Sequence, residues 1–239
     1  MNIKFKMNCA WYYFKDAHIK RMPLVSGRWG TGRMALRNKY ADIKRFVSKK
    51  DPFIVDGGSN VGDTVAAFLW LYPHSRISAF EPLHTCAEKL RERFISCPNV
   101  IIYENALADS YQTKEFYVTE NQVSSSLRKP LEMEAIKCEI NTVRLDGMVN
   151  KVPDVLKLDV QGCEMEALIG CGAMLKGIPA IVLEAQFLKL YEHQATYSDI
   201  DIFLNANDHI LFNIYEMFTR KNGRVSGLDA LYIRKDLIV

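Results

Sequence analysis

The sequence predicts an α/β fold built on a mostly parallel sheet, and two observations carry this prediction. From Asp51 onward, short apolar runs bounded by turn residues alternate with segments of helical periodicity, a pattern typical of βαβ units. A glycine-rich turn, FIVDGGSNVGDT at 53–64, joins the first apolar run to the first helical segment. With 239 residues, 49% of them hydrophobic, the chain is long enough for one large core.

Five apolar runs are expected to form parallel strands, at 53–56, 76–81, 100–106, 155–159 and 180–184. Helices are expected between them at 62–71, 85–95 and 163–171. Segments 113–119 and 138–146 alternate apolar and polar residues, which indicates an antiparallel excursion between the third and fourth parallel strands. In the tail we expect a helix at 199–206 and strands at 210–215 and 227–234, the last one antiparallel at one side of the sheet.

Charge divides the chain into a basic arm, residues 1–50, and an acidic body, residues 51–239. The arm holds thirteen Lys and Arg against Asp16 and Asp42, whereas the body holds eighteen basic and twenty-six acidic residues. Such a run is most often a solvated face, but it also fits an anionic partner such as nucleic acid, a phospholipid surface or a phosphorylated acceptor. Trp29 lies between Arg28 and Arg33, a grouping that can stack on a sugar and bind phosphate.

We therefore hypothesise that the arm helps to recognise an anionic acceptor, such as a nucleotide-linked or lipid-linked sugar. Its aromatic residues 11–14 could equally dock the arm on the body or on a second subunit. The six cysteines show no Cys-x-x-Cys pair, which indicates free thiols in a reducing compartment. The longest apolar run, 65–72, is too short to span a bilayer, and the N-terminus lacks the pattern of a signal peptide, so we expect a cytoplasmic protein.

The glycine turn does not fit a dinucleotide. Such a site needs Gly-x-Gly-x-x-Gly, and no register of residues 56–63 (DGGSNVGD) gives that order. Asp63 is also expected in the first helical turn, where its carboxylate would repel a pyrophosphate. These two features disfavour a nicotinamide oxidoreductase and favour a ligand that is not a doubly charged anion.

Carboxylates follow four of the predicted parallel strands: Asp56, Glu81, Asp159 and Glu184. In open α/β sheets this carboxyl edge is where ligands bind. Each carboxylate alone could be a helix cap or a surface ion pair. Four together suit a ligand with cationic groups and a ribose, because carboxylates attract cations and accept hydrogen bonds from sugar hydroxyls. S-adenosylmethionine has these features.

Several motifs in order resemble the FkbM family of S-adenosylmethionine-dependent methyltransferases. They are FIVDGGSNVGDT (53–64), AFEP (79–82), NALAD (105–109), SSSL (124–127), TVRLD (142–146) and LKLDVQGCEMEALIGCGAML (156–175). The resemblance covers the body from about Asp51 to ALYIRKD (230–236) and leaves out the arm. It implies a Rossmann-like class I methyltransferase fold: a seven-stranded, mostly parallel sheet with helices on both faces and an antiparallel strand at one side. It also implies O-methylation of a hydroxyl on a glycan, sugar or natural-product acceptor.

The resemblance implies an S-adenosylmethionine site built from the glycine turn and three later motifs. Its predicted members are Asp56, Gly57, Gly58, Asn60 and Gly62 around the amino-acid part, Glu81 at the ribose, Asn105 and Ala106 at the adenine, and Ser124 to Ser126 with Asp159 at the methyl-transfer region. Ser59, Asp63 and Pro82 are further predicted members. The family usually reads Asp-Val-Glu-Gly where this chain has Gln161. Gln161 can form hydrogen bonds but cannot act as a base.

A sugar hydroxyl needs a base, and the candidates are Asp159, Glu164, Glu184 and His193, of which Asp159 is the strongest. Glu164 also fits simple compensation of the helix dipole, and a lone His is more often a surface or capping residue. Asp159 and Glu184 could share Mg²⁺, but without a third ligand we predict no metal.

Two rival functions stay open. One is a nucleic-acid methyltransferase anchored by the basic arm, which the acidic body and the lack of an Asp/Asn-Pro-Pro-aromatic motif make less favoured. The other is a non-catalytic interaction module, suggested by Gln161 alone.

Overall fold

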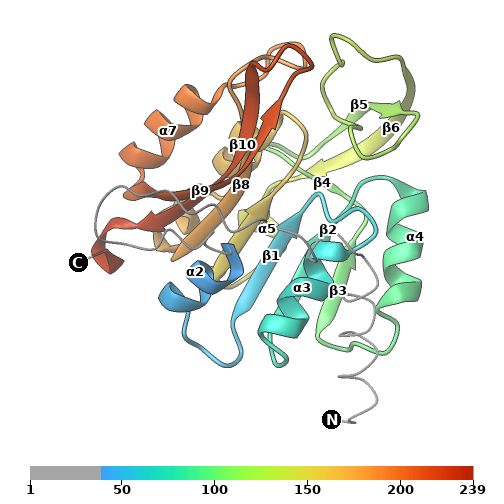
Figure 1. Cartoon of the computed structure of the whole chain (residues 1–239). Helices are drawn as coiled ribbons and strands as arrows, with labels where there is room; N and C mark the ends of the chain where they lie inside the picture. The colour runs from blue at the N-terminus through green and yellow to red at the C-terminus, as the bar shows by residue number, and fades with distance from the viewer. Residues whose placement is uncertain (1–38, 239) are drawn as a thin grey trace.

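The computed structural model describes residues 39–238 and arranges them around a seven-stranded sheet (Figure 1). The strands are β1 (Phe53–Gly57), β2 (Arg76–Phe80), β3 (Val100–Tyr103), β7 (Val155–Leu158), β8 (Ala180–Gln186), β9 (His209–Thr219) and β10 (Val225–Arg234). Their order across the sheet is β3-β2-β1-β7-β8-β10-β9. The first five are parallel, and β10 runs antiparallel to both of its neighbours. The predicted fold class is therefore confirmed.

Helices cover both faces of the sheet, as predicted. On one face lie α2 (Lys39–Phe46), α3 (Asp63–Leu71) and α4 (His84–Arg93), and on the other lie α5 (Leu145–Met148), α6 (Glu164–Ile169), η2 (Gly172–Gly177) and α7 (Tyr197–Ala206), with a last short turn, η3 (Lys235–Leu237), near the C-terminus. Ile43, Phe68 and Leu90 join the core of the first face, and Leu168 and Leu204 that of the second. All of β1 is buried because parallel strands are covered on both faces.

The predicted excursion between the third and fourth parallel strands is a separate small sheet. It contains β4 (Ala106–Leu107), β5 (Gln112–Thr119) and β6 (Ala135–Val143), with β5 and β6 antiparallel. The prediction of one continuous strand at 100–106 was wrong, because two strands of different sheets, β3 and β4, lie there. The chain leaves the large sheet after Tyr103, and Ala106 pairs instead with Thr142 of β6. Glu104 and Asn105 mark the break in the sequence, but the new partner lies on β6 and no local pattern indicates it.

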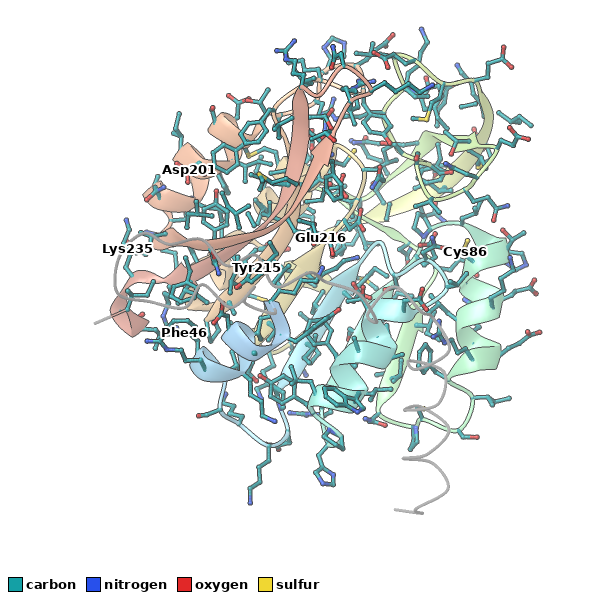
Figure 2. The ribbon with its side chains drawn as sticks, viewed as in Figure 1. Phe46, Cys86, Asp201, Tyr215, Glu216 and Lys235 are labelled. Atoms are coloured by element: carbon teal, nitrogen blue, oxygen red, sulfur yellow. The ribbon has the colours of Figure 1, made fainter. Side chains whose placement is uncertain are left out.

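Helix α2 packs on the sheet although the sequence placed it within the arm. Its buried Asp42 accepts a hydrogen bond of 2.8 Å from the Tyr215 hydroxyl on β9. Phe46 meets Phe212 edge to face, with ring centroids 4.7 Å apart (Figure 2 labels Phe46 and Tyr215). Residues 1–38, including Trp29 and its flanking arginines, lie outside the described residues, so the roles predicted for them stay predictions.

Two further predictions concern single features of the body. The described cysteines, among them Cys86 on α4, are free thiols, as expected (Figure 2). Between residues 39 and 238, no helix combines the length and the apolar character that crossing a bilayer would require.

Candidate active site

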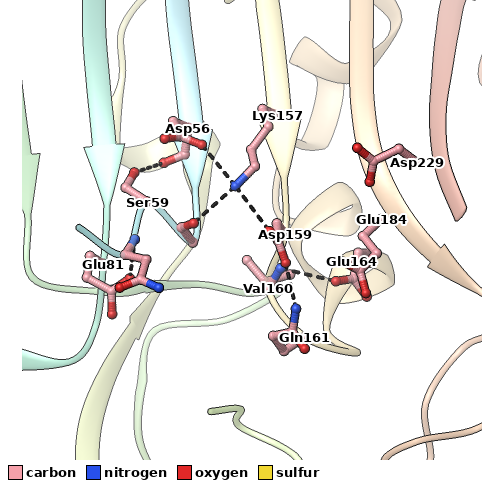
Figure 3. Close-up of polar contacts among 12 residues, drawn as sticks. Asp56, Ser59, Glu81, Lys157, Asp159, Val160, Gln161, Glu164, Glu184 and Asp229 are labelled. Atoms are coloured by element: carbon pink, nitrogen blue, oxygen red, sulfur yellow. Dashed lines mark hydrogen bonds and ion pairs between the residues drawn. The ribbon is translucent and has the colours of Figure 1, made fainter. Parts of the chain in front are cut away.

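The register of the parallel strands brings the four predicted carboxylates to one edge of the sheet. Gly57 of β1 lies beside Phe80 of β2 and Leu158 of β7, and Leu158 lies beside Leu183 of β8. The carboxylates precede or follow these aligned positions by a single residue, so they gather where the strands end (Figure 3). The expectation of an acidic carboxyl edge is confirmed.

The glycine turn needs glycine at two positions for different reasons. Gly58 has a φ of +74°, and a Cβ there would lie 1.8 Å from the backbone oxygen of Asp159. Gly62, at the start of α3, has a φ of +92°, and a Cβ would lie 2.4 Å from the Phe94 ring. These residues let the turn pass close to β7 and to α4. Gly58 also lines a cavity at this edge of the sheet.

Glu81 binds the backbone of the glycine turn and lines a cavity. Its carboxylate accepts hydrogen bonds from the backbone amides of Asn60, at 2.8 Å, and Leu83, at 2.9 Å. The residue is 7% exposed, and burial raises the pKa of its carboxyl although the two amides oppose the shift. Each carboxylate oxygen keeps a second lone pair that can accept a hydrogen bond from a ligand.

The cavity beside Glu81, which we call the cofactor cavity, encloses about 640 Å³ of space that is partly open to solvent. Seven residues predicted for the cofactor line it: Gly58, Asn60, Glu81, Pro82, Asn105, Ala106 and Asp159. Ser125, inside the predicted segment 124–126, and Gln161, where the family pattern has a Glu, line it as well. The sequence did not predict its other walls, which are Phe80, Cys86, Leu107, Phe116, Gln122, Val123, Leu127, Val160 and Cys163. Several come from the small sheet and its loop, whose placement no local pattern reveals.

The other residues predicted for the cofactor do not line this cavity: Asp56, Gly57, Ser59, Gly62, Asp63, Ser124 and Ser126. Asp63 forms an ion pair of 2.6 Å with Arg93 at the surface. The Ser126 hydroxyl donates to the backbone oxygen of Gln161 at 2.6 Å. The contacts of Asp63 and Ser126 hold the loops that border the cavity, and direct contact of these seven residues with a ligand stays a prediction.

Lys157, which the sequence analysis missed, carries a buried positive charge between two predicted site residues. Its ammonium donates to the backbone oxygen of Gly58 at 3.0 Å and lies 3.3 Å from Asp56 and 3.6 Å from Asp159 (Figure 3). Burial opposes its charge, but the two carboxylates outweigh that effect and raise the pKa of Lys157. The Asp56 side chain is fully buried and faces this ammonium. A single Lys within the apolar strand VLKL was the signal available in the sequence.

Asp159 is oriented from two sides. Gln161 donates from Nε2 to Asp159 Oδ1 at 2.7 Å, and Lys157 faces Oδ2. The other end of the Gln161 amide, Oε1, lies 2.8 Å from the Tyr191 hydroxyl, which donates to it. Both ends of the amide are therefore used. An ionised glutamate at position 161 could not replace it, because a carboxylate has no hydrogen to donate to the ionised Asp159. Gln161 is an integral part of this site.

Glu164 holds the turn that carries Gln161. Its carboxylate accepts hydrogen bonds from the backbone amides of Val160, at 3.1 Å, and Gly162, at 3.0 Å. Burial raises the pKa of Glu164 to about 7 against the effect of these amides. Glu164 lines neither of the cavities that touch Asp159. Its contacts are those of a residue that positions the site.

Glu184 lies at the end of β8 beside Asp229 of β10. It accepts a hydrogen bond from Gln186 Nε2 at 2.5 Å. Burial, with the negative charges of Asp159, Glu164 and Asp229, raises the pKa of Glu184 to about 8. Together with Asp159, Glu184 lines a second cavity on the other side of Lys157.

His193, the remaining predicted candidate for catalysis, is an exposed residue with a φ of +57° in the turn that follows Tyr191. It lines neither cavity that touches Asp159, so the structure does not bring it together with the three carboxylates. Within the part of the chain that the structure describes, no group of three or more His, Cys, Asp or Glu side chains is arranged to hold a metal ion.

Comparison with known proteins agrees with this architecture. The model of the methyltransferase FkbM domain matches residues 56–211. The chain is 27% identical over 174 residues to a 2-O-methyltransferase, NoeI, of Sinorhizobium fredii, a match that covers 65% of this chain and 72% of the relative. The crystal structure of a methyltransferase FkbM from Methylobacillus flagellatus has a similar fold, with a TM-score of 0.54 and 14% identity. That match covers 77% of this chain and 44% of the other, so this chain spans less than half of that protein.

Proposed function

The chain belongs to the FkbM methyltransferase family, and from this premise we propose that it transfers a methyl group from S-adenosylmethionine to a hydroxyl of a sugar or natural-product acceptor. One observation carries the proposal: Asp159 stands between the cofactor cavity and a second cavity that also contains Glu184. A transferase needs two substrates to meet at one point, and this arrangement provides such a point.

The residues around the cofactor cavity fit S-adenosylmethionine by their chemistry. Glu81 presents carboxylate oxygens that can accept hydrogen bonds from both ribose hydroxyls. Phe80, Leu107 and Phe116 supply apolar walls that suit a purine. Asp159 offers a negative charge to a sulfonium at the end of the cavity that lies toward β8. When bound, the cofactor would supply an electrophilic methyl group on this cationic sulfur.

We assign different roles to the two carboxylates that face the second cavity. Both oxygens of Asp159 are engaged, by Gln161 and by Lys157, so Asp159 is suited to orienting the acceptor and stabilising positive charge. Glu184 has a pKa near neutrality, the property of an efficient general base. We therefore propose that Glu184 takes the hydroxyl proton as the acceptor oxygen bonds to carbon. The name of the relative in Sinorhizobium fredii, 2-O-methyltransferase, supports oxygen as the acceptor atom.

The test is transfer of a ¹³C-labelled methyl group from S-adenosylmethionine to a pool of neutral saccharides, with mass spectrometry and NMR locating the label. We expect a methyl ether, and we expect Glu184→Gln to lower kcat by about 100-fold or more, the usual contribution of a general base. The matched control is Glu88→Gln, because Glu88 is 60% exposed on α4. A label on nitrogen, or an unchanged kcat in Glu184→Gln, would contradict the proposal.

A further inference from the structure

We propose that the second cavity is the acceptor site and that it takes a neutral sugar ring. This inference rests on the proposed function and adds to it the location and the charge of the acceptor. The cavity holds about 430 Å³ of partly open space between α2, α3 and the strands β7, β8 and β10.

Its position relative to the cofactor cavity is the first argument. Among the described residues that line these two cavities, Asp159 is the one that lines both. Figure 3 shows Asp159 between Lys157 and the pair Glu184 and Asp229. An acceptor in the second cavity would therefore approach the methyl group across the Asp159 side chain. Its hydroxyl would also lie on the same side as the proposed base, Glu184.

The charges of the lining are the second argument. Lys39 of α2 forms an ion pair of 2.6 Å with Asp229, and the ammonium of Lys157 faces Asp56 and Asp159. Both lysines are thus committed to carboxylates, and Glu184 adds a further carboxylate, which accepts a hydrogen bond from the amide of Gln186. A phosphate would meet carboxylates here with both lining ammonium groups already paired. Neutral hydroxyls can donate hydrogen bonds to carboxylates without that repulsion.

The remaining walls suit the ring of a sugar. Tyr40 of α2 lines the cavity, and its ring is fixed edge to face against Phe68 of α3, with centroids 5.6 Å apart. The negative face of an aromatic ring attracts the weakly positive C–H groups of a pyranose. The lining therefore combines carboxylates with an aromatic ring, two kinds of side chain that suit a polyhydroxylated ring.

Two threonines provide a matched test of this cavity. Thr64 is the second residue of α3 and lines the cavity, whereas Thr85 is the second residue of α4 and is exposed. Thr64→Trp would fill the proposed acceptor site, and Thr85→Trp would add the same bulk elsewhere. Tyr40→Ala is a second variant, which removes the aromatic wall without adding bulk. Thermal unfolding and titration with S-adenosylhomocysteine would establish that each variant is folded and binds the nucleoside.

The measurement is saturation-transfer NMR on protein loaded with S-adenosylhomocysteine. The probes are methyl glycosides of neutral hexoses and deoxyhexoses, with a hexose 6-phosphate as the anionic probe. We expect at least one neutral glycoside to bind the wild-type protein and Thr85→Trp, and to bind at least about tenfold more weakly to Thr64→Trp and Tyr40→Ala. We also expect the hexose 6-phosphate to bind the wild-type protein at least about tenfold more weakly than that glycoside does.

Three results would overturn the inference. Equal glycoside binding by Thr64→Trp would place the acceptor elsewhere, and preferred binding of the phosphate would contradict the charge argument. Binding of S-adenosylhomocysteine without any neutral glycoside would exclude this acceptor class. Failure of the wild-type protein to bind S-adenosylhomocysteine would be a different result, because it would overturn the proposed function itself and this inference with it.

Discussion

Lys157 shows how one buried charge can order a site. It donates to the Gly58 carbonyl of the glycine turn and faces Asp56 and Asp159, which lie on two neighbouring strands. Such a buried pair adds little net stability when complete, because removing both charges from water offsets their attraction. Removing only the lysine lowers the free energy of unfolding, because a buried carboxylate is then left without a partner. Lys157 therefore ties the geometry of Asp159 to that of the turn.

We expect Lys157→Met to lower the free energy of unfolding by about 3 to 5 kcal/mol, the cost of leaving a buried charge unpaired. The double variant Lys157→Met/Asp56→Asn should recover part of this loss because it removes the fully buried carboxylate as well. Urea unfolding monitored by circular dichroism would measure both effects. Equal stability of Lys157→Met and the wild-type protein would show that the ion pair does not order the site.

Gln161 is the residue where this chain departs from the family pattern, and the structure accounts for it. Its amide donates to Asp159 and accepts from the Tyr191 hydroxyl, so both ends of the amide are hydrogen-bonded. The observation that suggested a non-catalytic module thereby loses its force. The sequence could show only the change from an acid to an amide. The role of the amide depends on Tyr191, thirty residues later, which no local pattern places nearby.

At the scale of elements, the glycine turn is the part of the site that tolerates least change. Gly58→Ala would require a positive φ and would drive a Cβ into the backbone of Asp159. Gly223, in the turn between β9 and β10, has a φ of +81° but no atom within 4 Å of the position of a Cβ. Both alanine variants would suffer backbone strain, but only Gly58→Ala would also suffer a steric clash. Comparing the two variants therefore distinguishes the effect of strain from the effect of the clash.

We expect Gly223→Ala to cost about 1 to 2 kcal/mol of stability, the price of a left-handed residue, and to leave nucleoside binding unchanged. Gly58→Ala should cost more and should weaken S-adenosylhomocysteine binding by about tenfold or more, since strain of 1.4 kcal/mol already corresponds to tenfold. Chemical unfolding and calorimetric titration of the two variants would measure this. Matching effects in both would mean that close approach to β7 is unimportant.

The elements differ in how much of them the sequence could predict. The parallel strands and their carboxylates were predictable because each is an apolar run that ends in an acidic residue. The break between β3 and β4 was not predictable, because it depends on the pairing of Ala106 with Thr142 of β6, far along the chain. For the same reason, Phe116 and Leu127 entered the cofactor cavity without any prediction. The local pattern of residues is enough to predict the carboxyl edge of the sheet. The walls that the small sheet adds to the cavity depend on long-range strand pairing, which the local pattern does not reveal.

For the whole molecule, the buried carboxylates make stability depend on pH. An unfolded Glu titrates near ~4.3, whereas the pKa is about 7 for Glu164 and about 8 for Glu184 in the folded protein. Between these values the folded protein binds more protons than the unfolded chain, so the free energy of unfolding falls as pH rises. The stabilisation is fully present below about pH 4 and is lost as pH passes the folded pKa values.

We therefore expect the melting temperature to fall between pH 5 and pH 8.5, by about 2 to 4 °C for each kcal/mol lost. Glu184→Gln should flatten this dependence, most of all above pH 7, because it removes the group with the higher pKa. Glu88→Gln, at an exposed position, should leave the curve unchanged. Scanning calorimetry over this range would measure the effect, and parallel curves for Glu184→Gln and the wild-type protein would contradict a raised pKa of Glu184.

The central claim is that the cavity at the carboxyl edge binds a cationic nucleoside and not a dinucleotide. Calorimetric titration of S-adenosylmethionine, S-adenosylhomocysteine and NAD into the wild-type protein, Glu81→Ala and Glu88→Ala tests it most directly. We predict that both sulfur nucleosides bind and NAD does not, and that affinity falls by about 10- to 100-fold in Glu81→Ala, as expected for lost hydrogen bonds to a charged group. Glu88→Ala should bind like the wild-type protein. Binding of NAD, or undiminished affinity in Glu81→Ala, would contradict the account.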